Sequence, residues 1–108
     1  MTQEDFKTRL ADINAKYEQE KKYLYTHYAH ENNTVNVDDI VEDHIGCGRV
    51  LKMKTTFATF DKYPSLVYEC IEVKKDGTPK KKNIFRHVYQ VNLKKVNGKP
   101  VNYEKHYQ

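Results

Sequence analysis

Apolar residues recur along residues 2–30 at the spacing of one face of an α-helix. Successive members are four, three, four, seven and four positions apart, which keeps them on a single stripe. The stripe consists of Phe6, Leu10, Ile13, Tyr17, Leu24 and Tyr28, and Glu20 stands where a seventh apolar residue would fall. Thr2 can cap the first turn, and Asp5 occupies the position of a capping-box acid. The pattern therefore predicts a helix over residues 2–30.

The apolar stripe needs a surface to cover it. The chain's own sheet is one candidate for that surface. A partner protein or a second copy of the helix is the other, since the spacing suits a coiled coil that Glu20 interrupts. The residues that would make such a contact are Phe6, Leu10, Ile13, Tyr17 and Leu24. The sequence leaves both possibilities open.

After the polar residues 31–34, the apolar period shortens from about 3.6 to about 2, which is the period of a β-strand. Strands are expected from about residue 35, from about residue 49, at 66–73, at about 83–93 and near 101–103. Asp76-Gly77 and Asn97-Gly98 are strong hairpin signals between the later strands. In the second strand, alternation places Leu51, Met53, Thr55 and Phe57 on one side. In the fourth, it places Phe85, His87, Tyr89, Val91 and Leu93 inside, with Arg86, Gln90 and Asn92 outside.

These elements predict an α+β protein. An N-terminal amphipathic helix (1–31) precedes a small β domain (34–103), and the two form a single structural unit. Tight turns and about five short strands favour a small antiparallel barrel or a twisted meander.

The stretch Thr34–Val41, followed by Gly48-Arg49-Val50, resembles the opening of small SH3-like barrels. Those domains often begin with a hydrophobic-x-hydrophobic-Gly-Asp-x-Val strand and start the next strand with Gly-x-Val. Asp38 departs from that pattern, which prefers Gly at this position. The layout of a charged helix before a lysine-rich barrel is also similar in style to small uncharacterised proteins of bacterial mobile elements and phages. The resemblance implies a five-stranded SH3-like barrel that binds a peptide, a nucleic acid or a partner protein.

Charge is divided unequally along the 108 residues. Residues 1–73 carry 9 Lys+Arg against 13 Asp+Glu, whereas residues 74–108 carry 10 against 2. The basic residues gather around the two predicted turns: Lys74, Lys75, Lys80, Lys81, Lys82, Arg86, Lys94, Lys95 and Lys99. Such a surface attracts phosphates with little sequence preference, and Tyr63, Tyr68 and Tyr103 could offer stacking surfaces for bases. Solvated sheet edges, or contact with an acidic protein, would account for the same lysines.

Chemistry other than binding has little support in the sequence. The residues His44, Cys47, Cys70 and His87 lack the paired spacing of a zinc site, and His44 with Cys47 is the one nucleophile–base pairing. The acidic cluster Asp38, Asp39, Glu42 and Asp43 lacks the glycine and spacing of a calcium loop. We therefore expect no catalytic residues, no cofactor and no metal.

The expected function is a non-enzymatic binding module that contacts nucleic acid phosphates through its lysine-rich hairpins, as an accessory factor of a mobile element. The alternative is an adaptor that docks a partner, or self-associates as a homo-oligomer, through the N-terminal helix. No apolar run approaches the ~20 residues that span a bilayer, so no membrane contact is expected. The N-terminus does not read as a signal peptide, and two cysteines are too few for a disulfide framework, which together favour the cytoplasm.

Overall fold

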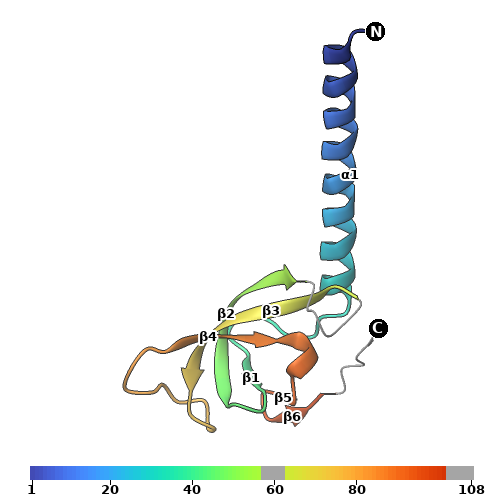
Figure 1. Ribbon diagram of the computed structural model, residues 1–108. Helices are drawn as coiled ribbons and strands as arrows, with labels where there is room; N and C mark the ends of the chain where they lie inside the picture. The colour runs from blue at the N-terminus through green and yellow to red at the C-terminus, as the bar shows by residue number, and fades with distance from the viewer. Residues whose placement is uncertain (57–62, 102–108) are drawn as a thin grey trace.

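The structure, a computed structural model, describes residues 1–56 and 63–101. Within these ranges one long helix is followed by six strands and a single turn of 3₁₀ helix. The elements are α1 (Gln3–Glu31), β1 (Ile40–Glu42), β2 (Cys47–Thr56), β3 (Ser65–Val73), β4 (Phe85–Tyr89), η1 (Gln90–Asn92), β5 (Lys95–Val96) and β6 (Lys99–Pro100). Figure 1 shows that α1 stands away from the sheet and touches it only at its C-terminal end.

The strands form one antiparallel sheet in the order β4-β3-β2-β1-β5-β6. The α+β class is therefore confirmed, but the five-stranded barrel is wrong, because the sheet has six strands and is open. Strands β1 to β4 are a meander, and β5 then returns to the free edge of β1 (Figure 1). The sequence did not reveal that return, because hairpin dipeptides specify only neighbours along the chain.

The N-terminus of α1 has the predicted cap. The Thr2 side chain accepts a hydrogen bond from the Asp5 N–H at 3.1 Å, and the Asp5 carboxylate accepts one from the Thr2 N–H at 3.2 Å. This reciprocal pair satisfies two backbone donors that the first turn leaves open. The helix ends at Glu31, and the N–H of the C-cap residue Asn32 bonds to the carbonyl of Tyr28. The observed bounds lie within one residue of the predicted 2–30.

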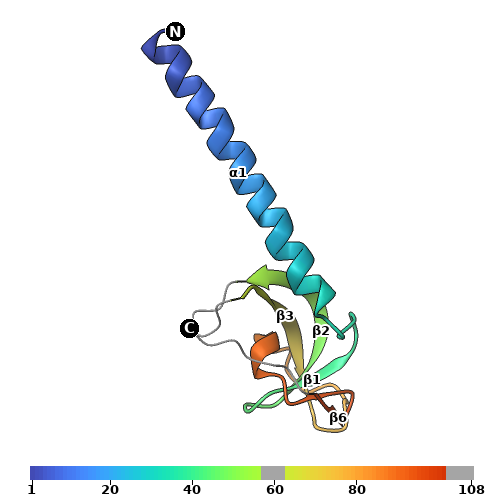
Figure 2. The same cartoon turned by 90° about the vertical axis from the view of Figure 1, so that its right-hand side faces the viewer.

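Within the described residues, the C-terminal end of α1 and the two asparagines that follow it hold the helix to the sheet. Ala29 is buried, the Tyr68 hydroxyl donates to Asn33 Oδ1 at 2.8 Å, and Gln90 Nε2 donates to the Asn32 carbonyl at 3.1 Å. Residues 1–20 are all exposed. Packing of the apolar stripe on the chain's own sheet, one of the two alternatives, is therefore wrong for all its members from Phe6 to Leu24, which are exposed. The helix leaves the sheet before most of the stripe could reach it (Figure 2).

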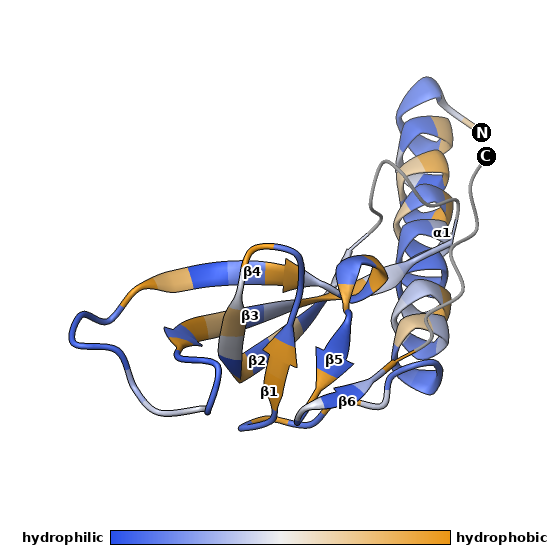
Figure 3. Ribbon diagram, turned by 90° about the horizontal axis from the view of Figure 1, so that it is seen from below, coloured by the Kyte–Doolittle hydropathy of each residue, from blue (hydrophilic) through white to orange (hydrophobic). Residues whose placement is uncertain are grey.

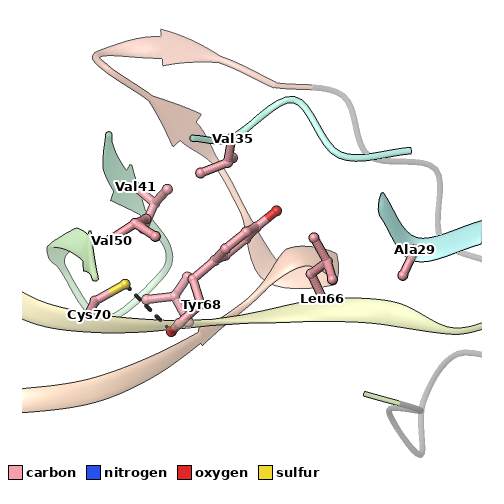
Figure 4. Packing of buried hydrophobic residues seen from close by; sticks show 8 residues of the cluster. Ala29, Val35, Val41, Val50, Leu66, Tyr68 and Cys70 are labelled. Atoms are coloured by element: carbon pink, nitrogen blue, oxygen red, sulfur yellow. Dashed lines mark hydrogen bonds between the residues drawn. The ribbon is translucent and has the colours of Figure 1, made fainter. Parts of the chain in front are cut away.

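The core lies between the concave face of the sheet, the segment before β1 and the base of α1. Its fully buried members are Ala29, Val35, Val41, Val50, Leu66, Tyr68, Cys70 and Val88. Figure 4 shows the Tyr68 ring directed across this space, between Val35 and Leu66. Because Tyr68 is completely buried, it cannot provide the stacking surface that the sequence suggested.

The two faces of β4 are the reverse of the prediction. Val88 pairs with Tyr68 and Arg86 with Cys70, which puts both on the core face. Phe85, His87 and Tyr89 lie on the outer face, where Phe85 is 66% exposed. The prediction failed because it treated residues 83–93 as one strand. The chain instead turns into η1 after Tyr89, and Val91 becomes buried from there.

A β-bulge changes the alternation of β2. Val50 pairs with Cys70 and Lys52 with Glu69, so Leu51 is an extra residue between them. Leu51 is partly exposed, whereas Met53 packs against the core. The predicted common face of Leu51, Met53 and Thr55 is therefore broken at its first member, and Phe57 lies outside the described residues.

The Asn97-Gly98 turn has the predicted backbone, with φ of 51° at Asn97 and 81° at Gly98. It joins β5 to β6, and β6 lies at Lys99–Pro100, just before the strand predicted near 101–103; Tyr103 lies outside the described residues. No helix within residues 1–56 and 63–101 is long and apolar enough to cross a bilayer.

Candidate functional site

The chain between β3 and β4 is a long basic loop. It begins with a tight turn in which Gly77 N–H donates to the Lys74 carbonyl at 2.8 Å, with Gly77 at a φ of 87°. The Asp76 carboxylate accepts from the hydroxyl and the N–H of Thr78, and these bonds lower the pKa of Asp76. A bond from Glu72 N–H to the Ile84 carbonyl closes the base of the loop. The ordered turn fixes the backbone from which Lys74 and Lys75 project.

The lysines of this loop are exposed. Lys80 Nζ lies 3.2 Å from a carboxylate oxygen of Glu72, so part of its charge is used within the fold. Lys74, Lys75, Lys81 and Lys82 form no ion pair with any acid in the described part of the chain. These four side chains can therefore bind an anion from outside.

The Arg86 side chain is mostly buried on the core face of the sheet, whereas the sequence predicted that it faces outward. Its side chain is 14% exposed and donates two hydrogen bonds to Asp43, at 2.9 and 3.0 Å, and one to the Gly46 carbonyl. Burial alone would raise the pKa of Asp43, but bonds from Arg86 and from the N–H groups of Ile45 and Gly46 lower it to about 2. Arg86 therefore holds the β1–β2 turn and is not placed to meet a phosphate.

The two basic turns belong to different strands, but both approach Ile40 of β1: a Cβ atom at Gly77 would lie 3.7 Å from Ile40 Cγ1. Val73, at the end of β3, lies in one row with Cys47 and with Glu42 at the end of β1. The other turn lies at the start of β1, where Asn97 N–H donates to the Ile40 carbonyl at 2.7 Å. Lys95 pairs with Glu42 and so lies in the same row as Val73, but it is four strands away from β4, or about 19 Å at the usual strand spacing. Lys95 on β5 and Lys99 on β6 therefore lie on the side of β1 away from β4, as does Lys94 just before β5 (Figure 3).

An aromatic row lies directly beyond the basic loop. Phe85, His87 and Tyr89 alternate along β4, on the face that points away from the core, and β4 is an edge strand of the sheet. His87 is more than half exposed, and its Nε2 lies 3.6 Å from Glu69. Sequence reasoning assigned these rings to the core. No local signal in the sequence places them outside, because the burial of Arg86 that turns its neighbours outward depends on Asp43, 43 residues away along the chain.

Lys52 and Lys54 on β2 share the outer face with this row. Their ammonium groups lie 3.1 and 2.9 Å from Glu69, which is itself mostly buried between them on β3. Glu69 therefore neutralises part of the positive charge at the centre of the face. A shallow hollow of about 570 Å³ runs between Leu51, Lys52, Glu69, Phe85 and His87.

The acidic cluster is dispersed among local contacts. Asp38 pairs with Arg49 at 3.0 Å, and Asp39 accepts from Asn36 N–H and Asn97 Nδ2. Glu42 accepts from the Cys47 thiol, and Asp43 pairs with Arg86. Each carboxylate thus stabilises a turn or a strand edge. No group of three His, Cys, Asp or Glu side chains within residues 1–56 and 63–101 could hold a metal ion.

Both thiols are buried and poorly suited to nucleophilic attack. Burial raises the pKa of Cys70 to about 11. Burial and the hydrogen bond to Glu42 raise the pKa of Cys47 as well. A thiol must lose its proton to become nucleophilic, so these shifts reduce the reactivity of both cysteines near neutral pH.

The second surface without a partner in the fold is the apolar stripe of α1. Its members Phe6, Leu10, Ile13, Tyr17 and Leu24 are between 45% and 65% exposed. Tyr28, the last member, differs because its ring stacks on Tyr63 at 5.5 Å between centroids. Tyr63 is therefore engaged with the helix rather than offered to a base.

Comparisons with known proteins do not name a family. No family model, no curated protein and no solved structure matches this chain.

Proposed function

We propose that this protein binds single-stranded nucleic acid on the outer face of β4 and the basic loop that leads into it. The observation that carries the proposal is the direct succession of Lys80–Lys82 and an exposed aromatic row on one edge strand. Phosphates would meet the lysines while bases stack on the rings. The loop and the row are joined through Asn83 and Ile84, so one short strand of nucleic acid can contact both.

Unpaired bases suit this surface better than a duplex. A stacking ring needs access to the flat side of a base, which is covered in a double helix. Phe85, His87 and Tyr89 recur at every second residue, about 7 Å apart along the strand, so adjacent rings can each take one base of an extended strand.

Little sequence preference is expected. Lysine offers a point charge rather than the fork with which arginine reads guanine, and the arginine of this region is engaged with Asp43. The contacting cations are Lys74, Lys75, Lys81 and Lys82, with Lys80 shared with Glu72. Arg86, Lys94 and Lys95 fall outside the proposed surface.

The test is a titration with a fluorescently labelled oligonucleotide of mixed sequence, as a single strand and as a duplex, at two salt concentrations. We expect micromolar binding of the single strand that fades as salt rises, because each phosphate contact releases a counterion. The variant Lys81→Gln/Lys82→Gln should lower the salt slope by roughly 0.7 per lost contact. Its matched control is Lys7→Gln/Lys16→Gln, which removes the same charge from α1. Failure to bind at low salt, or equal effects of the two variants, would refute the proposal.

A second function, docking of a protein on α1, is favoured by the exposure of the apolar stripe. The likeness to SH3-like barrels, the link to mobile elements and the cytoplasmic location stay predictions from the sequence.

A further inference from the structure

The apolar stripe of α1 has the repeat of a coiled coil. Leu10, Tyr17 and Leu24 are spaced by seven residues and take position a of the heptad. Phe6 and Ile13 take position d, as does Glu20. The first 20 residues of the chain are exposed, and at 1.5 Å per residue the exposed part of the helix is about 27 Å long. That length accommodates a partner helix of two to three heptads.

The positions that flank the stripe are basic or neutral. Charges at positions e and g decide which helix a coiled coil accepts, because they lie against the same positions of the partner. Over residues 3–24, the charged residues at e and g are Lys7, Arg9, Lys16 and Lys21. The acids of this part of the helix lie elsewhere: Glu4 and Glu18 at b, Asp5 and Asp12 at c, and Glu20 at d.

The basic flanks are available for a partner. Within the described residues, no ion pair joins Lys7, Arg9 or Lys16 to an acid. Lys21 lies along the edge of the stripe, with its ammonium 6.0 Å from the ring centre of Tyr17 and 5.7 Å from that of Tyr25. Its ammonium therefore lies over the ring of a stripe residue, Tyr17, and over that of Tyr25 beside the stripe.

A second copy of the chain is a poor occupant in parallel orientation. Position g of one helix then faces position e of the next heptad on the other, which brings Lys16 against Lys21. The two Glu20 side chains would also meet at position d inside the seam. Both contacts join like charges, and the second does so with little access to water.

An antiparallel pair of two copies also brings like charges together. It matches e with e and g with g, so that Lys7 faces Lys21 and Lys16 faces Lys16 when the stripes are centred on one another. Glu20 would then pack on Leu10, where its charge finds no partner.

We propose that α1 docks an acidic amphipathic helix of another protein. The partner presents an apolar a/d face to Phe6, Leu10, Ile13, Tyr17 and Leu24, and Asp or Glu at its e and g positions to the four flanking cations. A basic residue opposite Glu20 would complete the match. This surface is separate from the outer face of β4, so the inference does not depend on nucleic-acid binding.

Two synthetic peptides of three heptads test the inference on the full chain. Both carry Ile at a and Leu at d. One has Glu at every e and g position and the other has Lys there, and binding is measured by calorimetry. We expect micromolar binding of the Glu peptide that weakens at high salt, and at least about tenfold weaker binding of the Lys peptide, since the flanking charges then repel.

Variants on the exposed helix locate the contact without disturbing the fold. Ile13→Glu should weaken binding of the Glu peptide by at least about tenfold, because it places a charge in the seam. Ala15→Glu is the matched control, since it adds the same charge on the opposite side of the helix and should have little effect. Lys16→Glu/Lys21→Glu should shift the preference toward the Lys peptide.

Several results would overturn the inference. They are equal binding of the two peptides, binding of neither at high micromolar concentration, or binding of the Glu peptide that Ile13→Glu leaves unchanged. Sedimentation of the chain alone provides the other decisive measurement. A dimer that Ile13→Glu disperses would mean that a second copy takes the face, whereas a monomer agrees with the acidic partner. Oligonucleotide binding should be unaltered by Ile13→Glu, so the two proposals can fail separately.

Discussion

Arg86 on β4 lies on the core face of the sheet and donates two hydrogen bonds, of 2.9 and 3.0 Å, to Asp43 at the β1–β2 turn. The carboxylate is 4% exposed and also accepts from the N–H groups of Ile45 and Gly46. One contact therefore fixes a turn and decides which way the residues of β4 point. With Arg86 inside, Phe85 and His87 must face solvent, because successive side chains of a strand alternate.

The stability of the protein should fall in acid through this pair. The pKa of Asp43 is about 2 in the folded protein and 3.8 ordinarily, so folding favours the charged carboxylate. Its contribution is full above about pH 4 and is lost as the pH falls from there toward 2. Urea unfolding between pH 2 and 6 should show the free energy of unfolding decrease over that window.

The variant Asp43→Asn isolates the contribution of the pair. It leaves Arg86 buried with Glu72, at 3.5 Å, as its remaining acid, and should cost about 3 kcal/mol of stability at neutral pH. It should also flatten the change in stability between pH 4 and 2. A variant that loses stability equally at pH 6 and pH 2 would show that other carboxylates carry the acid sensitivity.

Gly48 is required by the approach of β2 to β3. A Cβ atom at this position would lie 2.7 Å from Cys70 Cβ, which belongs to a buried side chain on a paired strand and cannot move away freely. Gly48→Ala should therefore destabilise the fold by about 1–3 kcal/mol. Gly46→Ala is the control, because a Cβ there meets nothing within 4 Å and should change stability by less than about 0.5 kcal/mol. Chemical denaturation measures both, and similar losses would contradict the steric explanation.

The helix and the sheet should respond very differently to the same substitution along α1. Ala29 is 1% exposed at the base of the helix, so Ala29→Glu buries a charge and should cost more than about 2 kcal/mol. Ala15→Glu lies on the exposed part and should leave the unfolding midpoint of the sheet nearly unchanged. A comparable loss in both variants would mean that the exposed part of α1 does contribute to the stability of the sheet.

Local signals in the sequence were sufficient for much of the fold. The Thr2–Asp5 cap, the bounds of α1, strand β3 and the Asn97-Gly98 turn all depend on neighbours along the chain, and the structure has each of them. The tertiary features were not predictable in this way. The return of β5 to β1 and the burial of Arg86 arise from contacts between residues far apart in sequence. The periodicity of apolar residues does not predict such contacts.

The candidate sites show the same division. The exposed lysines of the β3–β4 loop follow from composition and turn chemistry, so the sequence identified them. The aromatic row on β4 was missed because hydrophobicity alone cannot tell which face of an edge strand is buried. An insertion of one residue, as at Leu51 in β2, or the early end of a strand, as at Tyr89 in β4, is enough to reverse the assignment.

The aromatic row yields the sharpest prediction for nucleic-acid binding. Phe85 is the most exposed ring of the row and follows directly from the basic loop, so Phe85→Ala should remove one stacking contact without opening the core. Stacking of a base on an aromatic side chain is worth about 1–3 kcal/mol, which corresponds to roughly 5- to 150-fold weaker binding of a single-stranded oligonucleotide. Unlike the loss of a lysine, the Phe85→Ala change should leave the salt slope unchanged, because no phosphate contact is removed.

Tyr23→Ala provides the control, since Tyr23 is 68% exposed on α1, away from the proposed surface. Fluorescence anisotropy at fixed salt measures the affinity of each variant for the single-stranded oligonucleotide. If Phe85→Ala and Tyr23→Ala bind it equally well, bases do not stack on β4.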